Sequence, residues 1–246
     1  MLRSLLATLV VIPLAPWLIR QGRRVRRETP RLAEPAGERQ GQAGSGPPLR
    51  LLITGDSAAA GVGVDDANEA FTGQLLRCLE DNFSVQWQRL AQSGLNCAEL
   101  LVWLHLQQPQ RFDTAVVSIG VNDVTGNTGR GRWQRNLVAL CRLLEQRYGV
   151  SYIILTAVPP MDKFPALPQP LRWFLGGKAR ELNAVMAQVA KRNPVVRLLQ
   201  FDMPFAEDYM AADGFHPSAA ACSLWAGAAA KVISDSFSGE SASEKV

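Results

Sequence analysis

The chain has 246 residues, of which 47% are hydrophobic, so it can bury one sizeable core and is expected to form a single main domain. Residues 1–31 hold seven arginines and one glutamate, whereas the rest of the chain holds 19 basic and 21 acidic residues. Because the excess positive charge is confined to a tail beside an apolar stretch, it favours anionic lipid as a partner and argues against nucleic acid.

The N-terminus begins with a mostly apolar stretch, residues 5–19, which is interrupted by Pro13 and Pro16 and followed by arginines. A helix of this length measures about 22 Å, so it either spans a bilayer core of about 30 Å with flanking residues snorkelling or lies in one leaflet. No small-residue cleavage site precedes the arginines, which argues against a cleaved secretory signal. Residues 1–27 are therefore predicted to be a membrane anchor with the main domain on the cytoplasmic face, an exported (periplasmic) domain being the alternative.

Two segments have the composition of mobile chain. Residues 28–48 contain four glycines, four prolines and almost no apolar residues, which predicts a flexible linker. Residues 238–246 are small and polar and are predicted to be a disordered tail. The main domain is accordingly expected to cover residues 49–237.

Strand-like apolar runs alternate with amphipathic helical stretches throughout that domain. The runs lie near residues 49–55, 85–91, 113–120, 151–158 and 195–201. Such alternation predicts an α/β fold, a three-layer α/β/α sandwich with a five-stranded parallel sheet.

Four short polar segments follow strand-like runs or precede the last helical stretch, and they are Gly55-Asp56-Ser57, Ser93-Gly94-Leu95-Asn96, Gly120-Val121-Asn122-Asp123 and Asp213-Gly214-Phe215-His216. Cleavage of an ester through an acyl-enzyme needs a hydroxyl nucleophile, a base and a group that holds the base. Ser57, His216 and Asp213 fit these three roles. Each segment alone is typical of a common turn, but their order and their places beside strands favour catalysis.

The four segments resemble those of the SGNH hydrolase family, the GDSL esterases and lipases, whose named residues are a Ser, a Gly, an Asn and a His in this order. The resemblance covers about residues 49–237 and implies a flavodoxin-like fold, with Ser57, Gly94 and Asn122 as oxyanion-hole donors. Ala58 departs from the family pattern, which has a leucine there.

Three polar neighbours of these residues are expected to support the loops without taking part in the chemistry. Asp56 and Asp123 are predicted to fix loop geometry through bonds to the backbone, and Asn96 is predicted to brace the Gly94 turn. His105 lies in a helical stretch and is interpreted as a packed or surface histidine.

Small members of the family include lysophospholipases, thioesterases and arylesterases, so the resemblance implies hydrolysis of a small-molecule carboxylic ester through an acyl-serine. The predicted anchor favours a lipid-derived ester. The same residues would serve an acyltransferase, which stays open as an alternative. A membrane-tethered binding protein that has kept the fold is a second alternative, and the intact set of five site residues argues against it.

Residues 158–174 form a proline-rich apolar segment after the fourth predicted strand. Met161, Phe164, Leu167 and Trp173 in this segment are predicted to form a wall of an acyl-chain groove or to touch the bilayer. The alternative is a loop that packs on its own helix.

No cofactor or metal ion is expected. The glycine-rich residues 55–63 lack the Lys-Ser/Thr pair of a phosphate-binding loop, and residues 61–66 lack the third glycine of a dinucleotide-binding fingerprint. The four cysteines have no metal-ligand spacing and are expected to be buried as small apolar residues. The sequence does not indicate an oligomeric state.

Overall fold

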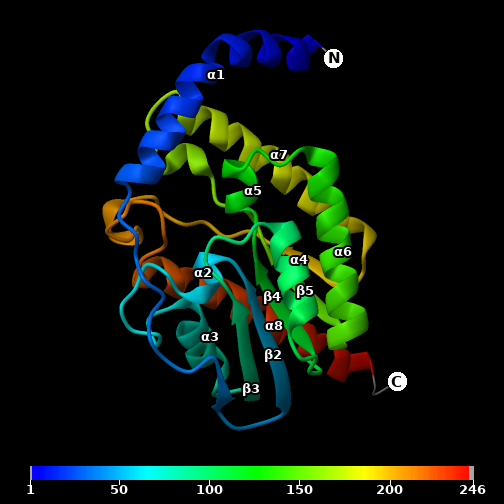
Figure 1. The fold of residues 1–246 in the computed structure, drawn as a ribbon. Coiled ribbons are helices and arrows are strands. Elements are labelled where there is room, and N and C mark those ends of the chain that lie inside the picture. Colours follow the sequence, from blue (N-terminus) through cyan, green and yellow to red (C-terminus); the bar gives the residue numbers. More distant parts are fainter. Residues whose placement is uncertain (1, 244–246) are drawn as a thin grey trace.

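The computed structural model describes the backbone of residues 2–243 and the side chains of residues 13–237 (Figure 1). The strands are β1 (Gln40–Ala43), β2 (Pro48–Gly55), β3 (Ser84–Ala91), β4 (Thr114–Ser118), β5 (Tyr152–Thr156) and β6 (Val196–Leu199). The helices are α1 (Leu2–Glu28), α2 (Ser57–Ala60), α3 (Phe71–Leu79), α4 (Cys97–Leu106), α5 (Val121–Thr125), α6 (Arg130–Tyr148), α7 (Leu171–Arg192) and α8 (Ala219–Ser243), with short 3-10 helices η1 (Met161–Lys163) and η2 (Glu207–Tyr209).

The described strands form one six-stranded sheet in the order β1-β3-β2-β4-β5-β6. The five predicted strands are present and parallel, and the sheet gains β1, which pairs antiparallel with the edge of β3. β1 has the sequence Gln-Gly-Gln-Ala, without β-branched or aromatic residues, so the strand pattern that marks the other five is missing.

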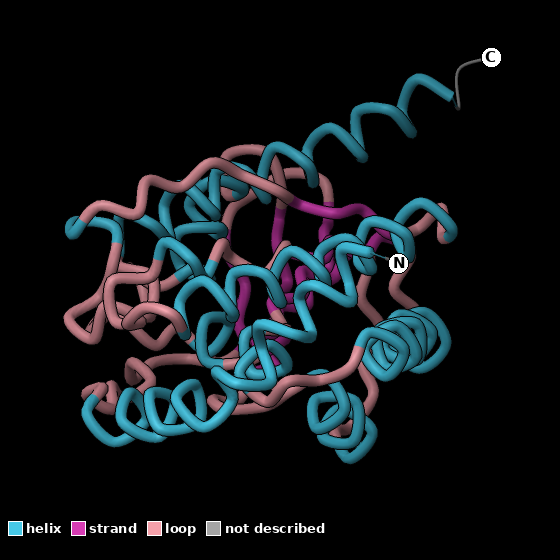
Figure 2. The backbone as a smooth tube through the Cα atoms, turned by 90° about the horizontal axis from the view of Figure 1, so that it is seen from above, coloured by secondary structure: helices cyan, strands magenta, loops and turns pink. Residues whose placement is uncertain are grey.

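Helices cover both faces of the sheet, which confirms the three-layer sandwich (Figure 2). Successive residues of β2 point into opposite cores, since Leu52 belongs to the cluster that contains the buried side chains of α4, α6 and α7, whereas Leu51 and Ile53 belong to the cluster under α3 and α8. Strands that are buried on both faces explain the continuous apolar runs in the sequence.

The register of the central strands decides where the site lies. Gly55, the last residue of β2, pairs with Ala91 at the end of β3 and with Ser118 at the end of β4. The loops that follow these three strands therefore emerge side by side at the carboxyl edge of the sheet, where open α/β folds bind their ligands.

The second half of α1 is docked on the main domain. Leu14 and Leu18 pack against the core that contains α7. The side-chain amide of Gln21 donates a hydrogen bond of 2.7 Å to the carbonyl oxygen of Gln169, and its oxygen accepts one of 3.1 Å from the backbone N–H of Leu171. This half of the predicted anchor is thus part of the domain surface.

Within the described residues, no helix carries an apolar stretch long enough to cross a bilayer. The side chains of residues 1–12, which include much of the predicted anchor, lie outside the described part of the chain. The predicted disordered tail, residues 238–246, also falls outside it apart from the backbone of α8, which continues to Ser243.

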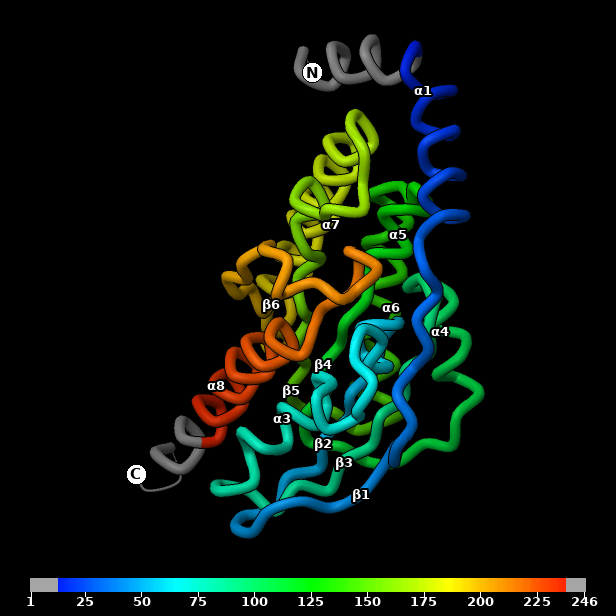
Figure 3. The backbone as a smooth tube through the Cα atoms, turned by 90° about the vertical axis from the view of Figure 1, so that its left-hand side faces the viewer, coloured from blue at the N-terminus to red at the C-terminus, as the bar shows by residue number. Residues whose placement is uncertain are grey.

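Residues 29–47, which we call the N-terminal strap, run from α1 along the domain to the sheet edge and include β1 (Figure 3). Several glycines and prolines of this segment, which the sequence predicts to be a flexible linker, lie in close contact with the domain. Pro35 is buried, and a Cβ on Gly44 would lie only 2.4 Å from the carbonyl oxygens of Glu80 and Phe83. Composition alone does not distinguish these uses of glycine and proline.

The cysteines and the second histidine largely meet expectation. Cys97, Cys141 and Cys222 are buried, and burial raises the pKa of Cys141 and of Cys222 to about 12, so both stay neutral thiols. Cys78 differs, since it is exposed on α3. His105 is an exposed residue of α4.

Candidate active site

The structure joins Ser57, His216 and Asp213 in one chain of hydrogen bonds. Ser57 is the first residue of α2, directly after β2, and its Oγ lies 2.9 Å from Nε2 of His216, which is 159 positions away in the sequence. The other ring nitrogen, Nδ1, lies 2.6 Å from Oδ2 of Asp213. This is the arrangement in which a histidine can take the proton of a serine hydroxyl.

Asp213 is held so that it can fix the histidine. Its Oδ1 accepts hydrogen bonds of 2.9 Å from the backbone N–H groups of Phe215 and His216. Burial opposes the charge of Asp213, but these bonds and the one from the imidazole outweigh it and lower the pKa of the carboxyl. A charged Asp213 keeps the proton of a neutral imidazole on Nδ1, which leaves Nε2 free to accept from Ser57.

Ser57 is placed by a close approach between β2 and β4. Gly55 has a φ of +149°, and a Cβ there would lie 1.8 Å from the carbonyl oxygen of Ser118. Asp56 follows, donates its backbone N–H to the same oxygen at 3.0 Å and caps α2 by accepting from the backbone N–H of Ala58 at 3.2 Å. The predicted bracing role of Asp56 is confirmed, and burial raises the pKa of this carboxyl to about 7.

Gly94 lies on the loop that follows β3, and Asn122 is the second residue of α5, which comes shortly after β4; both are next to Ser57 at the carboxyl edge of the sheet. The Asn122 side-chain amide donates a hydrogen bond of 3.0 Å to the carbonyl oxygen of Leu95, which uses one of its two N–H groups. A Cβ added to Gly94 would meet no atom within 4 Å beyond its chain neighbours, so this glycine faces open space. The three predicted oxyanion donors thus follow neighbouring strands at the carboxyl edge of the sheet.

The loop of Gly94 is anchored to the start of α4 and to α5. Asn96 caps α4 and forms a capping box with Glu99, whose side chain accepts from the Asn96 backbone at 2.9 Å. Asp123 accepts from the backbone N–H of Cys97 at 2.8 Å, and burial raises the pKa of Asp123. The predicted supporting roles of Asn96 and Asp123 are confirmed.

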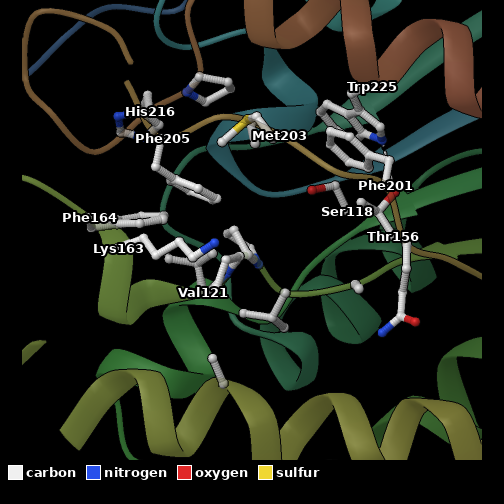
Figure 4. Close-up of a pocket in the computed structure, with 18 of the residues that line it drawn as sticks. Ser118, Val121, Thr156, Lys163, Phe164, Phe201, Met203, Phe205, His216 and Trp225 are labelled. Atoms are coloured by element: carbon white, nitrogen blue, oxygen red, sulfur yellow. Dashed lines mark hydrogen bonds between the residues drawn. The ribbon is translucent and has the colours of Figure 1, made fainter. Parts of the chain in front are cut away.

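A cavity of about 530 Å³ opens beside Ser57 and His216, and Figure 4 shows Phe164 and Phe205 on one side of it and Phe201 and Trp225 on the other. Further residues of its lining are Ala58, Val121, Val158, Met203 and Met210. The cavity is large enough for an acyl chain, and most of its wall is apolar.

Most residues of the predicted acyl-groove wall lie elsewhere. Phe164 does line the cavity. Met161 and Leu167, however, are buried in the core at 0% and 2% exposure, and Trp173 is 49% exposed on α7, outside the cavity lining. The alternative of a loop that packs on its own helix describes Met161 and Leu167 better, since this loop lies so close to α7 that a Cβ on Gly176 would be 2.4 Å from Asp162 Cβ.

Sequence reasoning missed the apolar residues that follow β6. Phe201, Met203 and Phe205 alternate with polar or proline residues, and all three line the cavity. Their position after the last parallel strand, at the edge that carries Ser57, is the signal that could have identified them. Among the described residues, no group of three or more His, Cys, Asp or Glu side chains could hold a metal ion.

The chain is similar to known esterases. It is 28% identical over 188 residues to the GDSL-like esterase Rv1075c of Mycobacterium tuberculosis, an alignment that covers 72% of this chain and 59% of that protein. The chain therefore spans less than two thirds of that relative's length.

Solved structures share the fold at low sequence identity. One is a carbohydrate esterase family 2 enzyme from Corynascus thermopiles with its carbohydrate binding domain, at 15% identity and a TM-score of 0.63 over 80% of this chain and 68% of that chain. Another is the psychrotrophic esterase EstA from Pseudoalteromonas sp., at 18% identity and a TM-score of 0.57 over 77% of this chain and 99% of that chain.

Residues 53–223 match the model of the GDSL-like lipase/acylhydrolase family. The match covers more than half of the chain and includes every residue of the four polar segments. The resemblance seen in the sequence is confirmed, and the chain belongs to the GDSL-like lipase/acylhydrolase family.

Proposed function

We propose that the chain hydrolyses carboxylic esters through an acyl-serine intermediate. The observation that carries the proposal is the hydrogen-bonded chain from Asp213 through His216 to Ser57 beside an apolar cavity. Family membership and the esterase activity named for the relatives support the same reaction.

In the first half of the reaction, Oγ of Ser57 attacks the ester carbonyl carbon while Nε2 of His216 takes the hydroxyl proton. Asp213 stabilises the resulting imidazolium. The carbonyl oxygen becomes an oxyanion, which the backbone N–H groups of Ser57 and Gly94 and the side-chain amide of Asn122 stabilise. Collapse of this intermediate breaks the bond to the alcohol, which leaves with the proton from His216.

In the second half, water attacks the acyl-serine while His216 again takes the proton. Collapse of the second tetrahedral intermediate releases the carboxylic acid and returns the proton to Ser57. An acyltransferase would differ only in that an alcohol or amine acceptor replaces water. Analysis of the products formed in water and in water with added ethanol separates the two, and hydrolysis is expected to dominate.

The substrate class proposed here is an ester with an apolar acyl chain, of the kind found in lipids. The aromatic and methionine lining of the cavity supports it, because such side chains bind alkyl chains by burying apolar surface.

Association of the N-terminal segment with an anionic membrane, with the domain on the cytoplasmic face, belongs to the same proposal, the exported location being the alternative. Trp17 and Ile19 are each 55% exposed, and the arginines that follow on α1 are exposed as well. Aromatic and cationic residues together suit a bilayer surface that carries negative charge. Co-sedimentation with vesicles of phosphatidylcholine and phosphatidylserine tests this, and equal recovery with and without vesicles would contradict it.

A fluorophosphonate probe tests the reaction, because it labels only a serine whose hydroxyl is activated. The wild-type protein is expected to be labelled and Ser57→Ala to be unlabelled. Ser118→Ala is the matched control, since Ser118 also lines the cavity and its backbone oxygen is unchanged by the substitution. A folded wild-type protein that resists labelling would exclude the proposed mechanism.

A further inference from the structure

The N-terminal strap places one carboxylate against the loop that carries Gly94. Oε1 of Glu34 accepts a hydrogen bond of 2.7 Å from the Ser93 hydroxyl and one of 3.1 Å from the Ser93 backbone N–H. The two residues are 59 positions apart, and Ser93 directly precedes Gly94. Two hydrogen bonds from one residue to the same carboxylate oxygen fix both the side chain and the peptide plane of that residue.

Glu34 is itself held in place by the pairing of the strap with β3. Its second oxygen accepts a hydrogen bond of 2.6 Å from Arg39, whose other guanidinium nitrogen donates to the carbonyl oxygen of Ala91 at 3.2 Å. The backbone oxygen of Arg39 accepts from the N–H of Arg89 at 2.6 Å. Burial opposes the charge on Glu34, but the bonds from Ser93 and Arg39 outweigh it and lower the pKa of this carboxyl.

These contacts matter because little else holds Gly94. On its carboxyl side, the carbonyl oxygen of Leu95 accepts from Asn122, and on its amino side Ser93 is bonded to Glu34. Apart from Gly94 and its two chain neighbours, no residue has an atom within 4 Å of a Cβ built on Gly94. The direction of the Gly94 N–H therefore depends on the residues that flank it.

We propose that Glu34 is a positioning residue, which acts through Ser93 to aim the Gly94 N–H at the oxyanion. The inference rests on the proposed function and deepens it, since it makes the N-terminal strap a part of the catalytic apparatus. Glu34 is not among the residues that line the acyl cavity. Its removal should therefore weaken binding of the transition state and leave binding of the ground-state ester nearly unchanged.

The first test compares the hydrolysis of p-nitrophenyl butyrate by Glu34→Ala and Glu34→Gln, with rates expressed per active site titrated with a phosphonate. In Glu34→Ala we expect kcat to fall about ten- to a hundredfold with KM within about twofold of wild type, because misplacing a catalytic group has effects of this size. Glu34→Gln keeps an oxygen that can accept from Ser93, so it should recover most of the rate.

Glu28→Ala is the matched control, because Glu28 also pairs with an arginine on the N-terminal segment, but at an exposed position on α1. It should keep the wild-type kcat and KM. If Glu34→Ala yields no folded protein, Ser93→Ala replaces it, since that substitution removes the shorter of the two bonds and keeps the backbone N–H; a several-fold loss of kcat is then expected.

A second measurement separates positioning of the oxyanion donor from general support of the loop. Oγ of Ser57 adds to the carbonyl carbon of a trifluoromethyl ketone, and the ketone oxygen becomes an alkoxide. The product butyrate binds without forming an alkoxide. Glu34→Ala should lose affinity for the ketone in proportion to its loss of kcat and should bind butyrate like the wild type.

The inference is overturned if kcat per titrated site in Glu34→Ala, or in Ser93→Ala where that variant replaces it, stays within about twofold of wild type, or if affinities for ketone and butyrate fall together. Failure of the proposed function looks different. In that case the wild-type protein itself would not react with the phosphonate, whereas a reactive wild type beside an unaffected Glu34→Ala removes this inference alone.

Discussion

The two sides of the active site differ in the kind of contact that holds them: hydrogen bonds on one side and, on the other, aromatic contacts as well. On the side of β3 and β4, the loops around Gly94 and Asn122 are short and are tied by hydrogen bonds. Ser93 is hydrogen-bonded to the strap, and Leu95 and Cys97 are hydrogen-bonded to residues of α5. Asn96 is hydrogen-bonded to a residue of α4.

On the side of β5 and β6, the connections are longer, and aromatic contacts join them in addition to hydrogen bonds such as those between Val158 and Asn183. Phe164 packs edge-on against Phe215 with ring centroids 5.2 Å apart and lies 5.9 Å from the ring of Phe205. A backbone hydrogen bond of 3.3 Å from Ala166 to Gly214 joins the two loops. Phe215 immediately precedes His216, so the cavity wall also supports the base.

The difference indicates that the polar side stabilises the oxyanion and the aromatic side binds the acyl chain. A developing oxyanion needs donors that do not have to reorganise, and directional hydrogen bonds provide such donors. An acyl chain needs apolar surface of suitable shape, which aromatic side chains provide without fixed directions. Substitutions on the polar side should therefore change kcat, and those on the aromatic side should change the choice of acyl chain.

Asp213→Asn is expected to have the largest effect. Asp213 is a polar residue on the aromatic side, and it fixes the tautomer of His216 that accepts the proton of Ser57. The asparagine can keep the bonds from the two backbone N–H groups, but its amide nitrogen would face Nδ1 of His216 and donate to it. The ring proton would then sit on Nε2, which could no longer accept from Ser57. By analogy with serine proteases we expect kcat to fall about 10⁴-fold.

Steady-state hydrolysis of p-nitrophenyl butyrate measures this effect, with Asp208→Asn, an exposed position in the same connection, as control. A loss below about tenfold would show that Asp213 has a different role.

Asn122→Ala tests the polar side. The substitution removes a predicted oxyanion donor and leaves the carbonyl oxygen of Leu95 without the bond from Asn122. Loss of one such donor lowers kcat about 10²- to 10³-fold in serine hydrolases, and KM should change little. Fluorophosphonate labelling of the folded variant and its kcat report on this together, and a kcat within a few-fold of wild type would place the oxyanion elsewhere.

The polar side was largely predictable from the sequence, because its residues are close in sequence to the predicted strands that position them. Ser57, Gly94 and Asn122 each come shortly after a strand that the sequence predicts, and on the aromatic side Asp213 is only three residues from His216. Strand pattern and loop chemistry then fix which edge of the sheet these residues share.

The strap and the cavity wall were not predictable in the same way. β1 has no side-chain pattern and exists because β3 offers an unpaired edge, and Glu34 reaches Ser93 only because of that pairing. Met161 and Leu167 are apolar residues in a loop, and nothing in their spacing tells whether they face a cavity or a core. Such features depend on contacts between distant segments, which a single sequence does not record.

The smallest expected effect is on the aromatic side and distinguishes Phe164 from Trp173, which the sequence grouped together. Phe164 lines the cavity and is 3% exposed, whereas Trp173 is 49% exposed and lies outside the lining. Phe164→Leu keeps an apolar side chain but enlarges the cavity. We therefore expect the ratio of kcat/KM for octanoyl over butyryl esters to rise about three- to tenfold, the range that one or two methylene contacts provide.

Trp173→Ala is the matched control and should leave that ratio unchanged. Because Phe164 also packs against Phe215, Phe164→Leu should lower kcat for both esters by a similar small factor while the ratio rises. The kcat/KM values for a series of p-nitrophenyl esters from acetyl to decanoyl measure both effects. An unchanged profile in Phe164→Leu, or a shifted one in Trp173→Ala, would mean that the acyl chain occupies a surface other than the cavity between α7 and α8.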